Sequence, residues 1–151
     1  MDTHDWDRSN PFTIDVVVTA TDVDGYGHVS THHYVRWLID CAFAHSEAVG
    51  LPETACRELS RGMAAREFRV ELLASAYEGD SLKVANWISH ADGKLRASRQ
   101  FQIINVDSGK TLVRGMFDFV CTNLENGRPA KMPAIFAERY IVESEELNRE
   151  V

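Results

Sequence analysis

A short stretch ahead of the longest apolar run carries most of the side chains that could do chemistry. The stretch TDVDGYGHVSTHH, residues 21–33, holds two aspartates, two glycines and three histidines. Three interpretations compete for it: a metal site, a structural turn with a helix cap, and a catalytic carboxylate held beside a helix N-terminus. Because each interpretation demands a different spacing, the spacing can be used to rank them.

Metal binding has the weakest support. His28 and His32 are four residues apart, but helical zinc pairs normally lie inside one helix together with a third ligand. A calcium loop starting at Asp22 would need a bidentate glutamate at its twelfth place, where this chain has His33. We therefore expect no metal and no other cofactor.

A structural role fits several of these residues. Ser30 or Thr31 could cap a helix by accepting a hydrogen bond from a free backbone N–H group. Asp22 could close an Asx-turn, and Gly25 and Gly27 could supply backbone conformations with positive φ. For Asp22 we favour this structural interpretation.

Asp24 is the strongest candidate for chemistry. It is followed by glycine and lies just ahead of a helix, whose first N–H groups have no partner within the helix. Such groups can polarise a carbonyl oxygen and stabilise the oxyanion that forms on attack. A carboxylate on one side and N–H donors on the other are the minimum that acyl transfer requires. Spacing alone leaves a purely structural role for Asp24 open.

Composition excludes several classes of protein. The chain has 151 residues, 44% apolar and 26% charged, which suits one ordinary globular domain. Its formal net charge of −7 argues against a nucleic-acid-binding protein. The three cysteines, Cys41, Cys56 and Cys121, lack metal-type spacing and fit reduced thiols. The polar start and the absence of a run of transmembrane length predict a cytoplasmic protein with no membrane partner.

One long helix is predicted over residues 31–49, before Gly50. Its charged residues, Arg36, Asp40 and Glu47, fall on one narrow stripe. Apolar side chains fill most of the remaining positions: Tyr34, Trp37, Leu38, Cys41, Phe43, Ala44 and Ala48. Because this helix is apolar nearly all round, other elements must cover it.

The rest of the chain is predicted to form strands and a final helix. Alternation and turn signals predict strands over residues 12–20, 66–72, 82–88, 95–106 and 111–122, and a helix over 134–150. In the 66–72 strand, Phe68, Val70 and Leu72 face one way. In the 95–106 strand, the polar side carries Arg96, Ser98, Gln100 and Gln102. We therefore expect an α+β fold in which an antiparallel sheet of about five strands wraps around one long central helix. The open sheet edges predict at least a dimer.

The chain resembles the hotdog-fold acyl-CoA thioesterases, the 4-hydroxybenzoyl-CoA thioesterase-like group. The segment TDVDGYGHVSTHHYVRWLIDCA (21–42) matches the family signature D-x-D-x-x-G-h-V-x-x-x-x-Y-x-x-[WF]. The segments FRVELLASAYEGDSLKV (68–84) and GRPAKMP (127–133) are similar to two further family segments, in the same order. The resemblance implies one hotdog domain over residues 1–151, assembled as a homodimer or homotetramer.

The resemblance also implies an activity: hydrolysis of an acyl- or aroyl-CoA thioester to free acid and CoA. Asp24 would be the catalytic carboxylate, acting on the thioester directly or through a water. A backbone N–H near Thr31 would bind the oxyanion, and Gly27 would let the loop approach the substrate. The surrounding substrate contacts would come from His28, in a shaping role, Ser30 and Tyr34. Lys94 and Arg96, which cluster with Arg99 after a hairpin, are candidates for the CoA phosphates.

Some features depart from the family pattern. Many relatives have Asn-Asn or Tyr-His where this chain has Ser30-Thr31, which leaves the substrate preference open. A second subgroup keeps its carboxylate inside the helix after His-Gly-Gly, a start that this chain lacks, so Asp40 is only the runner-up carboxylate. His33 is expected to have a packing or surface role. The alternative functions are a non-catalytic acyl-ligand-binding protein of the same fold and an acyl-carrier-protein thioesterase.

Overall fold

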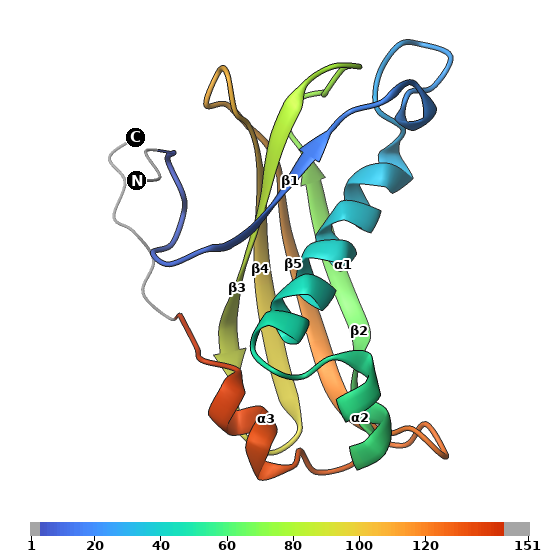
Figure 1. Cartoon of the computed structure of the whole chain (residues 1–151), viewed down its shortest axis with the longest axis vertical. Coiled ribbons are helices and arrows are strands. Elements are labelled where there is room, and N and C mark those ends of the chain that lie inside the picture. Colours follow the sequence, from blue (N-terminus) through green and yellow to red (C-terminus); the bar gives the residue numbers. More distant parts are fainter. Residues whose placement is uncertain (1–3, 144–151) are drawn as a thin grey trace.

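The computed structural model describes residues 4–143, which contain one five-stranded antiparallel sheet. Across the sheet the strands lie in the order β1 (Phe12–Val17), β3 (Ser81–Ala91), β4 (Arg96–Asn105), β5 (Thr111–Asn123) and β2 (Arg61–Leu72). The long helix α1 (Thr31–Ala48) crosses one face, and the short helices α2 (Glu53–Leu59) and α3 (Ala134–Arg139) lie at its C-terminal end (Figure 1). The predicted α+β fold, with one sheet around one long helix, is confirmed.

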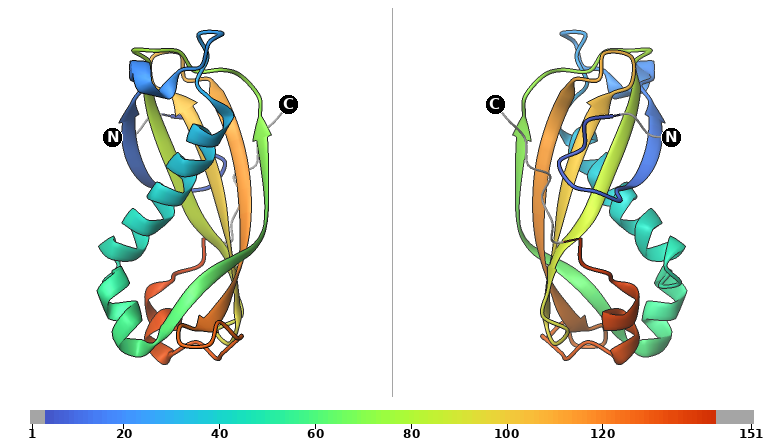
Figure 2. Two further views of the ribbon diagram at one scale, coloured as in Figure 1. Left: turned by 90° about the vertical axis from the view of Figure 1, so that its right-hand side faces the viewer. Right: turned by 90° about the vertical axis from the view of Figure 1, so that its left-hand side faces the viewer.

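Helix α1 packs on the sheet through a single stripe. Its buried residues are Tyr34, Trp37, Leu38 and Cys41, whose spacing of three and four places them on one side of the helix. Gly115 of β5 permits the close approach, because a Cβ atom there would lie 2.9 Å from Leu38 Cδ1. The side views show α1 crossing the twisted sheet obliquely (Figure 2).

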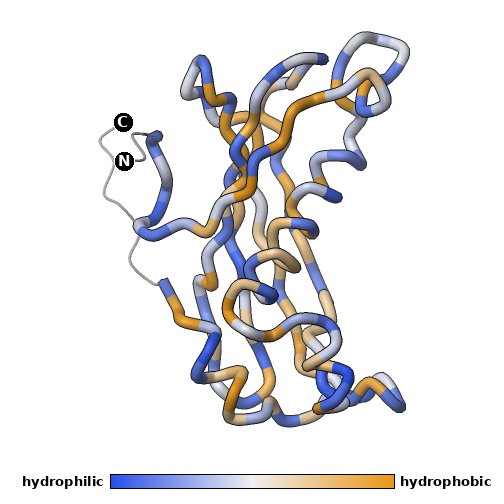
Figure 3. Tube along the Cα trace, viewed as in Figure 1, coloured by the Kyte–Doolittle hydropathy of each residue, from blue (hydrophilic) through white to orange (hydrophobic). Residues whose placement is uncertain are grey.

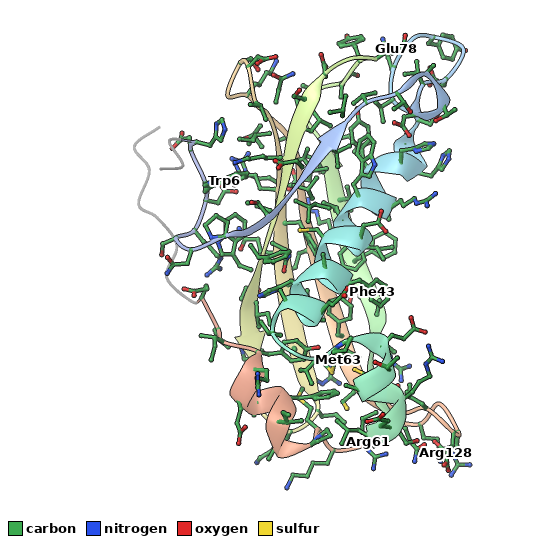
Figure 4. The ribbon with its side chains drawn as sticks, in the orientation of Figure 1. Trp6, Phe43, Arg61, Met63, Glu78 and Arg128 are labelled. Atoms are coloured by element: carbon green, nitrogen blue, oxygen red, sulfur yellow. The ribbon has the colours of Figure 1, made fainter. Side chains whose placement is uncertain are left out.

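The opposite side of α1 is not covered within the single chain. Phe43 is 65% exposed and Ile39 is also exposed, so the expected cover of the helix is incomplete within one chain. The physical reason is that one sheet contacts only one side of a helix. Phe43 projects from the half of α1 that lies near α2 and Met63 of β2 (Figure 4).

The outer face of the sheet is covered by the N-terminal segment. Trp6 packs edge-on against Trp87 of β3, with ring centroids 6.2 Å apart. Gln102, which alternation places on a polar side, is fully buried and accepts a hydrogen bond from the Asp7 N–H group at 2.9 Å. The hydropathy-coloured trace shows alternating hydrophobic and hydrophilic colours along the strands (Figure 3). Some polar side chains of the outer face, such as Gln102, are nevertheless buried because the N-terminal segment covers them.

Several boundaries differ from the prediction. The first strand ends at Val17, and a 3-10 turn, η1 (Ala20–Asp22), follows it. Strand β2 begins earlier than predicted, and α2 was not predicted. The C-terminal helix ends at Arg139 because the chain then extends, with the Glu143 N–H group donating to Ile88 O of β3 at 2.8 Å. The rest of the predicted helix, residues 144–150, lies outside the described residues.

Candidate active site

The loop that carries Asp24 closes on itself. Val23 and Val29 form an isolated antiparallel bridge. Inside it, the Asp24 N–H group donates to His28 O at 2.8 Å, and the Gly27 N–H group donates to Asp24 O at 3.1 Å. Gly27 has φ of +84°, a conformation that favours glycine. The same expectation for Gly25 was wrong, since its φ is not in that region.

The two oxygens of the Asp24 carboxylate have different surroundings. Oδ1 accepts hydrogen bonds from the backbone N–H groups of Tyr26, at 2.8 Å, and His28, at 3.3 Å. These contacts make Asp24 the residue that closes an Asx-turn. No partner is recorded for Oδ2 within residues 4–143, and the residue is exposed. The carboxylate is therefore held in place through Oδ1, and Oδ2 is available to a bound molecule.

Asp22 has a structural set of contacts. Its Oδ2 atom accepts hydrogen bonds from the Thr19 N–H group at 2.9 Å and from Thr19 Oγ1 at 3.1 Å. Its Oδ1 atom lies 3.1 Å from His33 Nδ1. Asp22 thus caps η1 and connects it to the first turn of α1, instead of closing the Asx-turn expected of it. His33 is engaged with Asp22, which agrees with its expected packing role.

The N-terminus of α1, which follows the Asp24 loop, presents two open donors. The neighbouring N–H groups are occupied: Val29 donates to Ala76 O, Ser30 to Asp22 O, and His33 to Ser30 O. Ser30 occupies the N-cap position, but its side chain makes no capping hydrogen bond. For the N–H groups of Thr31 and His32, no acceptor is recorded in the described part of the chain. This is the arrangement that an oxyanion site needs.

Tyr34 connects the helix to the chain between β2 and β3. Its hydroxyl oxygen accepts a hydrogen bond from the Ala76 N–H group at 2.8 Å, and the residue is only 3% exposed. Burial raises the pKa of this phenol. Because Ala76 O in turn accepts from the Val29 N–H group at 3.1 Å, the three residues fix the end of the Asp24 loop. These contacts give Tyr34 a structural role, and its expected contact with substrate stays a prediction.

His28 lies at the exposed surface of the same loop. Its ring packs edge-on against Tyr77, with centroids 5.3 Å apart. Only His28 is close to Asp24 in the chain, and its shaping role toward a substrate stays a prediction.

Lys94 and Arg96 lie away from Asp24 within one chain. Lys94 lies in the turn between β3 and β4, and Arg96 is the first residue of β4; Asp92 Oδ1 accepts hydrogen bonds from their backbone N–H groups at 2.8 and 3.0 Å. That turn is at the end of the sheet near α3, whereas the loop before α1 is at the opposite end (Figure 1). The third cation of this group, Arg99, is buried instead of exposed.

A cavity of about 510 Å³ lies between the C-terminal half of α1, α2 and the sheet. Its polar side includes Ser46, Arg99 and Tyr140, and the Asp24 loop does not line it. Sequence interpretation missed this cavity. A signal was present, because the alternation that puts Ser98 and Gln100 on the polar side of β4 puts Arg99 on the apolar side.

Other kinds of site find no support in the described residues. Between His4 and Glu143, no three His, Cys, Asp or Glu side chains gather in a way that could hold a metal ion. No described helix is both long enough and apolar enough to cross a membrane.

Comparison with known proteins identifies a family. The model of the thioesterase-like superfamily matches residues 18–140, which include the Asp24 loop, α1 and all strands except β1. No curated protein matches the chain significantly.

Solved structures share the fold at low identity. A 1,4-dihydroxy-2-naphthoyl-CoA thioesterase from Synechocystis has 20% identity and a TM-score of 0.78, over 87% of this chain and 96% of that one. A Staphylococcus aureus protein in complex with CoA has 19% identity and a TM-score of 0.80, over 91% and 85% of the two chains. A DHNA-CoA thioesterase from the same organism has 15% identity and a TM-score of 0.76, over 85% of each chain.

Proposed function

The chain belongs to the thioesterase-like superfamily, and we propose that it hydrolyses an acyl- or aroyl-CoA thioester to free acid and CoA. One observation carries the proposal: a carboxylate with a free oxygen lies on a loop that leads directly into two open backbone donors. The CoA thioesterases and the CoA complex among the structural neighbours support the same class of substrate.

Asp24 is the proposed catalytic residue. Its Oδ1 atom is fixed by two backbone N–H groups, which orients Oδ2 toward a reactant. Oδ2 either attacks the thioester carbonyl carbon, which forms a mixed anhydride that a water then hydrolyses to the free acid, or it removes a proton from an attacking water. In the second route the water oxygen bonds to the carbonyl carbon while its proton passes to Asp24.

The N-terminus of α1 provides the proposed oxyanion site. The negative charge that develops on the carbonyl oxygen is stabilised by the N–H groups of Thr31 and His32 and by the positive end of the helix dipole. The carbon–sulfur bond then breaks and CoA leaves as a thiolate. A thiol has a pKa of about 8.5, so the leaving group needs little help from a general acid.

A second copy of the chain is part of the proposal. Strand β2 forms one edge of the sheet, so its outer backbone groups lack a strand partner. Phe68 is 55% exposed on this strand, and Leu72 and the adjacent Leu73 are also exposed. We infer that β2 pairs with a second copy to form a homodimer, itself able to form a homotetramer.

Pairing through β2 also bears on Lys94 and Arg96. The ten residues of β4 span about 33 Å, so these cations are distant from Asp24 of their own chain. Antiparallel pairing of two β2 strands reverses one chain relative to the other. Lys94 and Arg96 would therefore contact the phosphates of a CoA bound at the Asp24 of the partner copy.

The test is a thiol-release assay on short, long and aromatic acyl-CoA esters. We expect the wild type to release CoA, and Asp24→Asn to lose about two to four orders of magnitude in turnover. Asp40→Asn is the matched control, since Asp40 is an exposed carboxylate of α1 that pairs with Arg36 at 3.9 Å. Loss of turnover in the control alone would move the assignment from Asp24 to Asp40. No release from any ester would favour an acyl-ligand-binding protein or a carrier-protein thioesterase.

A further inference from the structure

Arg99 carries a buried charge without a counterion. The residue is 6% exposed, and no carboxylate between His4 and Glu143 lies within 4.0 Å of its guanidinium group. The hydrogen-bonding contacts of the group are all to uncharged side chains: Asn86 Oδ1 at 2.6 Å, His45 Nδ1 at 2.8 Å, Ser46 Oγ at 3.0 Å and the Tyr140 hydroxyl. Burial lowers the pKa of Arg99, but a guanidinium group stays protonated in proteins.

The groups around Arg99 are themselves uncharged at neutral pH. Burial, followed by the charge of Arg99, lowers the pKa of His45 to about 4. Burial raises the pKa of the Cys41 thiol to about 11 and raises the pKa of the Tyr140 phenol. None of the three can therefore supply the missing negative charge.

Two features make the cation tolerable without neutralising it. The Arg99 guanidinium carbon lies 5.5 Å from the centroid of the Tyr140 ring, within the range of a cation–π contact. His45 and Ser46 belong to the last turn of α1, where the helix dipole places partial negative charge. The acidic side chain of the cavity wall, Glu53, is exposed and paired with Arg57 at 3.0 Å.

The hydrogen bonds of Arg99 leave one edge of the group open. Of its five N–H groups, those on Nη1 point to Asn86 and His45, and one on Nη2 goes to Ser46. Within residues 4–143 no hydrogen bond is found for Nε, and the second N–H of Nη2 is left for the Tyr140 hydroxyl or for a ligand. These two donors lie side by side on the planar group, which is the fork that a carboxylate binds with both oxygens. The Tyr140 hydroxyl, 3.1 Å from Ser46 Oγ, adds a further polar contact.

The cavity next to this cluster suits an apolar body. Its walls are formed largely by aliphatic and aromatic side chains, among them Ile39, Ala42, Phe43, Met63, Phe101 and Phe117. Its volume of about 510 Å³ lies in the range of small-molecule sites. We propose that this cavity binds an organic anion with an apolar body, whose carboxylate pairs with Arg99.

Such a carboxylate has two possible sources. It can be the far end of an acyl group attached to CoA, a use that rests on the proposed function. It can also be a free acid that binds independently of hydrolysis. Ser46 lies 15 residues after Thr31 in α1, or about 22 Å along the axis, so an acyl group held at Asp24 of the same chain would have to be long.

The first experiment measures binding directly, by isothermal titration calorimetry with octanoate and 1-naphthoate, and with octanol as the uncharged control. We expect the wild type and Asp24→Asn to bind the carboxylates more tightly than octanol. Arg99→Met should weaken carboxylate binding about 10- to 100-fold without changing the affinity for octanol. Arg36→Met, which removes an exposed cation of α1, should change neither affinity.

Folding of Arg99→Met is checked by circular dichroism and thermal unfolding without ligand. Arg99→Met removes an uncompensated buried charge but leaves Asn86 Oδ1 and Ser46 Oγ without a donor, so its two effects on the melting temperature oppose each other. If Arg99→Met fails to fold, Arg99→Lys provides the test. Lysine keeps the positive charge but lacks the two adjacent guanidinium N–H donors, so carboxylate binding should still weaken. Equal binding of octanoate and octanol by the wild type, or unchanged octanoate binding in a folded Arg99 variant, would overturn the proposal.

The second experiment separates the two sources. CoA thioesters that end in a carboxylate are compared with thioesters of equal length that end in a methyl group. A preference for the carboxylate ester that disappears in Arg99→Met identifies the acyl group as the ligand. Octanoate binding without such a preference identifies a free acid. The calorimetric binding measurements test the proposed carboxylate site even if no thioester is hydrolysed.

Discussion

His33 Nδ1 lies 3.1 Å from Asp22 Oδ1, and this contact ties the first turn of α1 to the turn that precedes the Asp24 loop. Through its other oxygen, Asp22 also accepts two hydrogen bonds from Thr19. One carboxylate therefore fixes both the entrance to the loop and the helix behind it. The neighbouring carboxylate, on Asp24, is held only through Oδ1, and its proposed catalytic role uses Oδ2.

Removing the Asp22 carboxylate should loosen the site without removing the proposed catalytic group. We expect Asp22→Ala to lower the free energy of unfolding by about 1–2 kcal/mol, as loss of a helix cap does, and to lower kcat/KM. Asp22→Asn keeps an acceptor for Thr19 and should cost less. Urea unfolding and thiol release measure the two effects, and a fully stable Asp22→Ala would contradict the structural role.

Gly27 and Gly25 form a matched pair. A Cβ atom would meet nothing within 4 Å at either position, but only Gly27 has positive φ. Gly27→Ala should therefore destabilise the loop conformation by about 1–2 kcal/mol and reduce kcat/KM, while Gly25→Ala should have little effect. Equal kcat/KM values for the two variants would show that the loop does not depend on this backbone conformation.

The Tyr34 hydroxyl is expected to contribute to stability. Tyr34→Phe leaves the Ala76 N–H group without its acceptor, which should lower the free energy of unfolding by about 1–3 kcal/mol. Tyr26 is 88% exposed, so Tyr26→Phe serves as the control and should be neutral. Unfolding in urea at pH 7 gives both values, and equal stabilities of the two variants would count against the contact.

His45 should make the stability of the protein depend on pH. Burial lowers its pKa from 6.5 to about 4, so between these values the unfolded chain binds more protons than the folded one. The contribution of neutral His45 to stability is therefore complete above pH 6.5 and is lost as the pH falls from 6.5 to 4. His45→Gln should show a flatter dependence of the free energy of unfolding on pH in this window. An unchanged slope would assign the dependence to other groups.

The exposed apolar face of β2 should hold two copies together. Phe68 stacks on Phe117 of β5, with ring centroids 4.8 Å apart, and its outer side is exposed. We expect Phe68→Glu to convert the proposed dimer into a monomer, as measured by light scattering after size-exclusion chromatography. Val17→Glu places the same charge on β1, at the other edge of the sheet, and should leave the dimer intact.

Local patterns predicted the elements that hold the fold together. Alternation identified the strands because each side chain of a strand faces one of two environments, and the run of apolar residues identified α1. Helix α2 was missed, although Pro52 at its N-cap position and the i, i+4 pair of Glu53 and Arg57 are local signals for it. A seven-residue helix is too short to show a clear apolar period.

Contacts between distant segments could not be predicted in this way. Gln102 is buried by the segment that contains Asp7, which lies 95 residues earlier in the chain. A local sequence pattern cannot predict a contact between residues so far apart in the chain. Arg99 was grouped with Lys94 and Arg96 because the three are close in sequence. Alternation along β4 places Arg96 and Arg99 on opposite faces of the sheet. Arg96 is exposed, whereas Arg99 is buried and faces the cavity among apolar side chains.

The covering of the outer sheet face by the N-terminal segment gives the protein an internal optical reporter. Two of its three tryptophans, Trp6 and Trp87, are buried against each other there, and Trp87 Nε1 donates to Ser9 O at 3.0 Å. The third, Trp37, lies on the other side of the sheet in the core beneath α1. Intrinsic fluorescence can therefore distinguish release of the N-terminal segment from loss of the helix core, with Trp37→Phe isolating the signal of the outer face.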